Sequence, residues 1–165
     1  MPTIADPYPA LISFQKALDD GVISVAPSRE TAGIHTHTDN PTGTEPRLTF
    51  VHMVGDTVTA LVMMVHAEPY QGLPCYTVGY AVPPEYRRQG RAKALLALVV
   101  QDMTVMFGRP GYPKSFYLEA VVSQSNLVSQ KVAEHVLGPK IDTGFDEASG
   151  EPIFQYMLRV DVPSP

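Results

Sequence analysis

Alternating polar and apolar positions predict three consecutive strands in the first half of the chain. Residues 48–53 alternate with a period of two, residues 58–66 form a second strand-like run, and residues 76–82 form a third. Gly55-Asp56 is typical of a turn between the first two runs, and the proline- and glycine-containing segment 69–74 separates the last two. The three runs predict an antiparallel meander.

Apolar residues spaced three and four positions apart predict helices in the second half. The clearest stripe spans residues 90–107, and a second spans residues 126–137 with Ser125 as its candidate N-cap. Residues 116–122 and 153–160 read as strands on either side of the second helix. The strand–helix–strand order in the middle of the chain, over residues 76–122, implies a parallel crossover in an otherwise antiparallel sheet, so the predicted fold class is α/β with a mixed sheet.

The N-terminal part is less regular. Residues 11–18 have helical spacing, but residues 27–46 lose all periodicity and are predicted to form a long loop. A long loop of this kind is expected to lie over a site or to be mobile. His35, His37 and Asp39 lie within this loop, but they are an incomplete set of ligands, so no metal site is predicted.

Composition and charge narrow the function. The 165 residues and the hydrophobic fraction of 44% suit one domain over residues 1–165. The formal net charge of −5 argues against a nucleic-acid partner and suits a cationic one such as an amine. Cys75 is the only cysteine, which excludes an intramolecular disulfide. Without a leader or a membrane-length apolar run, the chain is expected to be cytoplasmic, with no membrane partner.

The loop between the third strand and the next helix combines the features of an anion site. The strand ends at Val82, two prolines follow, and the helix starts just after Gly90. The first turn of a helix has unpaired N–H groups and partial positive charge. Gly90 permits close approach of the backbone to a ligand, and Arg87, Arg88 and Arg91 add charge. Together they suit a pyrophosphate.

The segment Val78–Ala92, which reads V-G-Y-A-V-P-P-E-Y-R-R-Q-G-R-A, resembles the signature of the GNAT acetyltransferases. That signature is a strand ending in valine, a proline turn, Arg or Gln, two residues, Gly, one residue, and Gly or Ala. A second segment is similar to the motif of the subgroup that includes ribosomal-protein alanine N-acetyltransferases; it consists of Glu119 to Val122 followed by Asn126, Ser129, Val132 and Gly138. The resemblance covers residues 47–160 and leaves residues 1–46 unmatched.

The resemblance implies a sheet that splays between its fourth and fifth strands, with acetyl-CoA lying in the resulting V. Main-chain groups of Tyr80, Ala81 and Val82 would then pair with the thioester and pantetheine, and Asn126 would bond the pantetheine arm. The pyrophosphate would lie in the loop formed by Arg87, Arg88, Gln89, Gly90, Arg91 and Ala92. The implied reaction is acetyl transfer to a primary amine by direct attack on the thioester.

An attacking amine must lose a proton, so a base within hydrogen-bond reach is expected. Glu119 is the first candidate, and His66 and His52 are the alternatives. Many members of the family also use a tyrosine of the last helix to protonate the leaving thiolate, but the matching positions here hold Ala133 and Glu134. Ser129 matches a serine of the subgroup pattern and is a candidate for contact with the thiol.

Several functional alternatives stay open at the level of sequence. The missing tyrosine favours a second class, a GNAT-like domain that binds acyl-CoA as a sensor or interaction module without turnover. The acceptor amine stays open among a protein N-terminus, a lysine side chain and a small-molecule amine, namely a polyamine, an amino acid or an aminoglycoside, and the subgroup motif tilts the prediction slightly toward a protein N-terminus. The wall of the acceptor site is expected to come from the loops over residues 27–46 and 142–152. The edge of the strand over residues 153–160 could pair with a second copy, which makes a homodimer an expectation.

Overall fold

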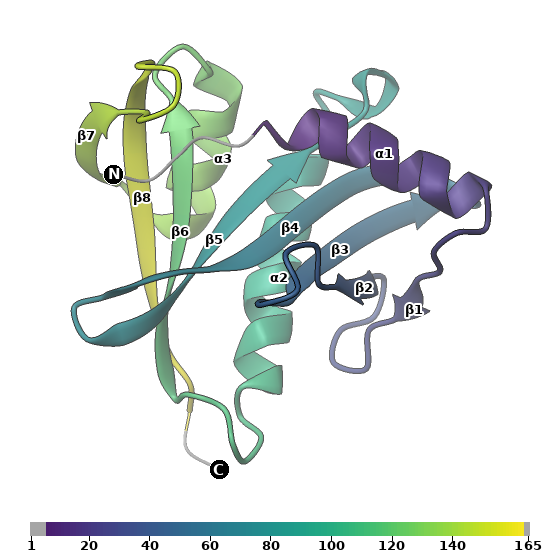
Figure 1. Cartoon of the computed structure of the whole chain (residues 1–165), viewed down its shortest axis with the longest axis horizontal. Helices are drawn as coiled ribbons and strands as arrows, with labels where there is room; N and C mark the ends of the chain where they lie inside the picture. The colour runs from purple at the N-terminus through teal and green to yellow at the C-terminus, as the bar shows by residue number, and fades with distance from the viewer. Residues whose placement is uncertain (1–5, 164–165) are drawn as a thin grey trace.

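The computed structural model of the protein describes residues 6–163, which form one eight-stranded sheet with three helices (Figure 1). The strands are β1 (Ala26–Pro27), β2 (His35–Asp39), β3 (Arg47–Val54), β4 (Thr57–Tyr70), β5 (Leu73–Ala81), β6 (Ser115–Ser123), β7 (Lys140–Phe145) and β8 (Pro152–Asp161). The helices are α1 (Pro7–Asp19), α2 (Arg91–Met106) and α3 (Leu127–Leu137), with a 3-10 turn η1 (Pro84–Tyr86) before α2. The spatial order is β1-β2-β3-β4-β5-β6-β8-β7, and only the β5–β6 pair is parallel. The predicted mixed sheet is confirmed.

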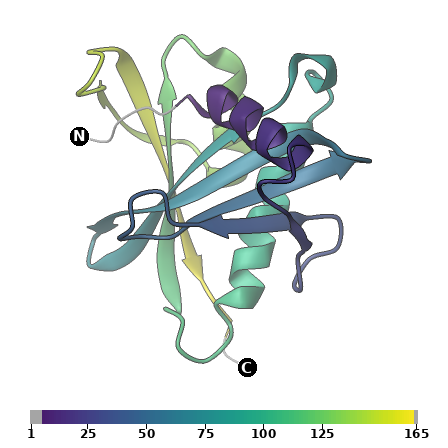
Figure 2. The ribbon, with the colours of Figure 1, turned by 45° about the vertical axis from the view of Figure 1, so that its right-hand side comes forward.

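The helices cover the two faces of the sheet unequally (Figure 2). α2 and α3 pack on one face over the larger core, which includes Leu95, Val99, Phe116, Leu118 and Ala133. α1 lies on the opposite face and buries a smaller cluster around Leu11, Val51, Val58, Leu61 and Ala81. Successive side chains of a strand point to opposite faces of the sheet. Within a strand, every second residue therefore faces α2 and α3, and the residues between them face α1.

The predicted meander is confirmed, but β4 and β5 extend past the predicted turn residues Pro69 and Pro74. Regular pairing ends at Ala67 opposite Cys75, and the register shifts before Tyr70 pairs with Leu73. Both prolines lie in this irregular stretch, where no ladder N–H is needed. The turn itself is Gln71-Gly72, two residues with φ of 49° and 78°.

The expectation of a long structureless loop over residues 27–46 is wrong. Residues 35–39 form β2, which pairs with β3 along its whole length. The segment alternates histidine and threonine and then ends in Asp39, so its period of two carries no hydrophobic signal. Likewise, the predicted loop over residues 142–152 begins inside a strand, because residues 140–145 form β7.

The predicted free edge over residues 153–160 is also corrected. β8 pairs with β6 along its length and with β7 over residues 152–156, so the second half of the strand alone is open on one side. The outermost strand at this end of the sheet is β7. The structural basis that the sequence suggested for a homodimer is therefore absent over the first half of β8.

The parallel pair β5–β6 is short, and its end creates the predicted splay. Hydrogen-bond register joins Cys75 to Tyr117, Tyr76 to Leu118, and Thr77 to Glu119, and pairing stops there. Beyond this point the two strands diverge into a V, which Figure 1 shows between β5 and β6. These are the fourth and fifth strands when the two-residue β1 is set aside, as the resemblance implied. The last pair, Thr77–Glu119, is called the fork below.

The N-terminus of α3, beside the V, is capped by Asn126 rather than by the predicted Ser125. The Asn126 side chain accepts a hydrogen bond from the Ser129 N–H at 3.0 Å. The Ser125 hydroxyl lies 2.8 Å from the Ser123 hydroxyl instead. The cap therefore lies one position further along the chain than predicted.

This difference is testable by stability. We expect Asn126→Ala to lower the free energy of unfolding by about 1 kcal/mol, the usual value of an N-cap. Ser125→Ala is the matched control and should change it by less than about 0.5 kcal/mol, as surface substitutions do. Urea denaturation followed by circular dichroism measures both. The assignment of the cap fails if Ser125→Ala is the more destabilising change.

Candidate active site at the divergence of two strands

The N-terminus of α2 presents a row of free main-chain donors. Gly90 is the N-cap residue with φ of 70°, and Arg88 also has positive φ at 63°. These left-handed residues curl the loop before the helix begins. Within the described residues, no main-chain N–H from Arg88 to Ala92 donates a hydrogen bond. The loop therefore has the geometry of an anion site at the positive end of a 16-residue helix.

The predicted loop side chains divide into two groups. Arg87 donates from Nε to the Val82 carbonyl at 2.9 Å and lies over the Tyr8 ring at 5.1 Å. Arg91 donates to the Gln89 side chain at 3.0 Å and to the Thr59 hydroxyl at 3.2 Å. These two arginines brace the loop against the sheet and α1. The Arg88 side chain is exposed and makes no hydrogen bond within the described residues, so it is the free cation of the loop.

Beyond the fork, β5 is paired on one side only. Tyr80 and Ala81 face Val62 and Leu61 of β4 across a regular ladder, whereas the side toward β6 has no partner strand in the described residues. An extended amide-bearing ligand could add to this edge as a further strand would. The main chain of Tyr80 and Ala81 is thus available on the side toward β6 for the predicted pairing with a ligand. The Val82 carbonyl already accepts a hydrogen bond from Arg87.

The Tyr80 side chain crosses from β5 to α3. Its hydroxyl donates to the Ser129 carbonyl at 2.7 Å and accepts from the Ser129 hydroxyl at 3.0 Å, beside the main chain of Ala133. Burial raises the pKa of Tyr80 to about 12, so the phenol stays protonated at neutral pH. The sequence pointed to Ser129 by its place in the motif and to Tyr80 by its main chain alone, and the fold joins their two hydroxyls.

The second motif also positions Asn126. Its Oδ1 is used as the cap of α3, but its amide nitrogen donates no hydrogen bond within the described residues. The N–H₂ group is therefore free for a ligand lying between β5 and α3, as the resemblance implied. Capping fixes the side chain first and thereby removes the entropy cost of orienting it.

Glu119 is a buried carboxylate at the fork, with 7% of its surface exposed. The Thr77 hydroxyl donates to its Oε1 at 2.8 Å, and the Gln155 amide donates to its Oε2 at 2.6 Å. It points to the face of the sheet that carries α1, because its neighbours Leu118 and Ala120 point into the α2–α3 core. Gln155 was missed from the sequence, since a polar residue on a half-exposed strand gives no signal of its partner.

The two histidine candidates lie on the other face. His66 is exposed and packs on Tyr76 at 4.8 Å between ring centroids, on the side of α2. His52 lies near the α2 loop, where burial and the nearby Arg91 charge lower its pKa. The thickness of the sheet therefore separates both rings from Glu119.

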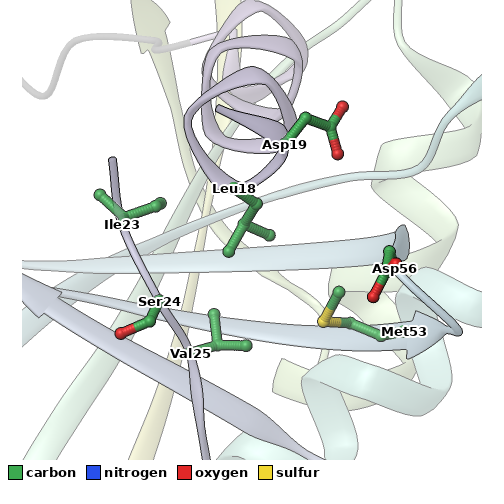
Figure 3. A pocket seen from close by; sticks show the side chains of 7 residues that line it. All are labelled: Leu18, Asp19, Ile23, Ser24, Val25, Met53 and Asp56. Atoms are coloured by element: carbon green, nitrogen blue, oxygen red, sulfur yellow. The ribbon is translucent and has the colours of Figure 1, made fainter. Parts of the chain in front are cut away.

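Two cavities lie along α1, away from the V. One, of about 470 Å³, lies at the C-terminal end of α1 and is lined by Leu18, Asp19, Ile23, Ser24, Val25, Met53 and Asp56. Figure 3 shows Leu18, Val25 and Met53 pointing toward one another while Asp19 points away. This apolar gap continues the smaller core and brings no catalytic group together.

Comparisons with known proteins agree with this geometry. A model of the acetyltransferase (GNAT) family matches residues 18–138, and the chain belongs to that family. Members use acetyl-CoA as donor and acetylate amines. No curated protein matches the chain by sequence.

Solved structures with the same fold include ribosomal-protein alanine acetyltransferases among other members of the family. The ribosomal-protein-S18-alanine N-acetyltransferase of Escherichia coli is 19% identical, with 72% of each chain covered and a TM-score of 0.52. The ribosomal-protein-S5-alanine acetyltransferase of Vibrio fischeri is 15% identical, covering 74% of this chain and 66% of the other, with a TM-score of 0.54. The protein yncA of Salmonella typhimurium, solved with its cofactor acetyl-CoA, is 16% identical, covering 73% and 68%, with a TM-score of 0.53. At these identities the matches confirm the fold.

The residues present fit acetyl-CoA. Free N–H groups and Arg88 suit its pyrophosphate, and the one-sided edge of β5 with the Asn126 amide suits its pantetheine arm. Among residues 6–163, no helix is long and apolar enough to cross a membrane.

The loop assignment predicts that Gly90→Glu abolishes CoA binding. The carboxylate would enter the phosphate cradle, and a side chain at φ of 70° adds strain of about 1–2 kcal/mol. Gly111→Glu is the matched control, because Gly111 also has positive φ (89°) and open space but lies beyond the far end of α2. Isothermal calorimetry with CoA measures both. Equal affinity in the two variants would show that the phosphates bind elsewhere.

Proposed function

We propose that this chain transfers the acetyl group of acetyl-CoA to a primary amine, with Glu119 as the general base. The observation that carries the proposal is the position of Glu119: it is a buried carboxylate on the last paired residue before β5 and β6 diverge. A cofactor thioester in the V would lie next to it, and an amine would reach it from the α1 face. Acetyl-CoA supplies the activated acetyl group.

The surroundings of Glu119 hold the carboxylate in one orientation. Thr77 and Gln155 each donate one hydrogen bond to a different oxygen, and each oxygen keeps a lone pair that can accept a proton from the amine or a bridging water. Because these two donors are already in place, the carboxylate needs little reorientation during the reaction. The base is therefore held in place before the acceptor arrives.

The leaving sulfur requires a hydrogen-bond donor on the other side of the V. The linked hydroxyls of Tyr80 and Ser129 lie there, beside the Ala133 position that lacks a tyrosine. The neutral phenol of Tyr80 keeps its bond to the Ser129 carbonyl, and the Ser129 hydroxyl hydrogen can rotate from Tyr80 to the sulfur. A tyrosine of β5 thereby holds a serine hydroxyl of α3 near the position where the family's tyrosine is missing.

Direct attack is favoured over a route through an acetylated enzyme thiol. Cys75 is the only cysteine of the chain, and it is buried beside Glu119. Burial and then the Glu119 charge raise its pKa to about 12, so the thiol stays neutral and is a poor nucleophile. The amine must therefore attack the thioester itself.

The alternative is a protein that binds acyl-CoA without turnover, which the alanine at position 133 favours. A rise in melting temperature with acetyl-CoA is expected for both functions. Release of free thiol with a panel of amines and N-terminal peptides is expected for the enzyme only. The panel includes small amines, because the family match leaves the acceptor open.

If Glu119 is the base, Glu119→Gln should lower kcat at neutral pH by about 100-fold or more, because general bases contribute on that scale. CoA affinity should stay the same. Glu134→Gln is the control, since Glu134 is an exposed carboxylate of α3. The pH–rate profile of thiol release measures the change. An unaltered profile in Glu119→Gln would exclude this residue as the base.

The hydroxyl pair gives a separate prediction. Tyr80→Phe and Ser129→Ala should each lower kcat by about 10-fold, the value of one hydrogen bond of about 1.4 kcal/mol. The double variant should be little worse than either, because the residues share one bond and act as a unit. Tyr112→Phe, at an exposed tyrosine, is the control. Strictly additive losses, or losses in CoA affinity alone, would contradict a shared role at the sulfur.

A further inference from the structure

The side-chain amide of Gln155 has one end bound to the proposed base and the other end free. Its Nε2 donates to Glu119 Oε2 at 2.6 Å. An ionised carboxylate only accepts hydrogen bonds, so the NH₂ end of the amide faces Glu119 and the oxygen is left over. Oε1 makes no hydrogen bond within residues 6–163, and it is not buried, because the buried side-chain polar atoms without a partner there are those of Thr31 and His35. The Gln155 oxygen is therefore accessible to a ligand.

Strand register places Gln155 between Glu119 and the opening of the V. Gln155 is opposite Val121 of β6, which lies two residues past Glu119 in the direction in which β5 and β6 diverge. Opposed residues project on the same face, so Gln155 and Glu119 both lie on the α1 face. The flanking residues Phe154 and Tyr156 accordingly pack in the α2–α3 core. β8 thus brings an amide next to the base, on the side where the thioester is expected to lie.

On this face, α1 covers the other arm of the V. A Cβ added to Gly79 of β5 would lie 3.6 Å from Cβ of Pro7, so the first turn of α1 rests directly on the strand past the fork (Figure 1). α1 packs mainly on β4 and β5. An amine that approaches Glu119 from the α1 face is thereby left with the side of β6 and β8, where Gln155 lies.

The charges around Gln155 suit a cation. Glu119 lies on one side of it, and Asp142 is the exposed residue of β7 opposite it on the other side. Arg159 lies further along β8, on the side away from the V, and is paired with a carboxylate of its own strand at 3.1 Å. The Lys140 ammonium lies 3.9 Å from the centre of an aromatic ring on the α2–α3 face. The two carboxylates therefore flank Gln155, while the cations of β7 and β8 are held elsewhere.

The two oxygens of this cluster are spaced to share one amine nitrogen. The Gln155 oxygen lies at most about 5 Å from Glu119 Oε2, because the two ends of an amide are about 2.3 Å apart and the hydrogen bond adds 2.6 Å. Two N–H bonds at a tetrahedral angle, each donating over about 2.9 Å, reach oxygens about 4.7 Å apart. A nitrogen that donates to Glu119 can thus donate to Gln155 as well.

We propose that Gln155 is a specificity-determining residue of the acceptor site, whose oxygen accepts the N–H of a primary amine that Glu119 does not take. This inference rests on the proposed function. A primary amine carries two N–H bonds in the neutral form that attacks. As the N–C bond forms, one proton passes to Glu119, and the C–S bond breaks with its electron pair leaving on the sulfur. The second N–H stays on the nitrogen in the amide product and is held by Gln155 throughout.

The same chemistry disfavours secondary amines. The neutral form of a secondary amine has a single N–H, which must be given to Glu119, so the Gln155 oxygen is left without a donor. The site is therefore expected to prefer a primary amine to its N-methyl counterpart by hydrogen bonding as well as by size. A peptide that begins with proline would be disfavoured for the same reason.

The test compares methylated and unmethylated amines in two matched variants. Gln155→Met and Thr77→Val each remove one donor to Glu119 with little change in side-chain shape, but only the first removes the free oxygen. The pairs are propylamine with N-methylpropylamine, and an alanine-initiated tripeptide with its N-methylalanine counterpart. Gln155→Met should lower the preference in kcat/KM for the unmethylated member by about 10-fold, the value of one hydrogen bond of about 1.4 kcal/mol. Thr77→Val should lower kcat/KM for both members equally.

Binding measured without turnover separates this inference from the proposed function. In the presence of CoA, which carries no acetyl group, calorimetry should show that Gln155→Met weakens binding of the unmethylated amines about 10-fold more than Thr77→Val does. Both variants should keep the CoA affinity of the wild type, which checks their folding. A preference for the unmethylated amine that is unchanged in Gln155→Met would overturn the inference and leave the proposed function intact. Binding that depends on Gln155, without acetyl transfer to any amine, would keep the contact and reject the proposed function.

Discussion

Parallel hydrogen bonding between β5 and β6 stops after Thr77–Glu119, and the candidate site depends on that stop. If the ladder continued, the main chain of β5 beyond Thr77 would be satisfied by β6 and closed to a ligand. Instead, α3 packs on β6, β8 and α2, and the half-buried Tyr80 of β5 bonds across to its first turn. Packing in the α2–α3 core fixes the position of the strands on one face of the sheet. On the other face, Glu119 links β5 to β8 through its hydrogen bonds with Thr77 and Gln155.

The divergence of β5 and β6 also explains how a carboxylate and a hydroxyl can both lie beside the V, although they belong to opposite faces of the sheet. Glu119 approaches from the α1 face, and the Tyr80 hydroxyl approaches from the α2–α3 face. A continuous sheet would separate these side chains by its full thickness, as it separates Glu119 from His66. Because the strands diverge, a proton acceptor and a hydroxyl donor can face the same ligand from opposite sides. The alanine at position 133 is then compatible with chemistry at the sulfur.

The charged side chains of the two faces also differ. The chain carries a net charge of −5, yet its arginines 87, 88 and 91 are concentrated at the α2 loop, where an anionic cofactor would bind. On the α1 face, Arg47 is neutralised by Asp39, to which it donates from Nε and Nη2.

The sequence by itself determined the family, the meander, the α2 loop and the choice of Glu119 as first candidate, because these depend on local period, on glycine and proline positions, and on a contiguous motif. The tertiary structure alone decided which residues meet. β2 was hidden because its alternation is polar, and Gln155 and Arg47 were not recognised because their partners lie on other strands. Strand parity placed the histidines and Glu119 on opposite faces, and pairing on both sides removed the expected edge over the first half of β8. Register and strand order are set by packing between segments that lie far apart in the chain, so they could not be predicted from short stretches of sequence.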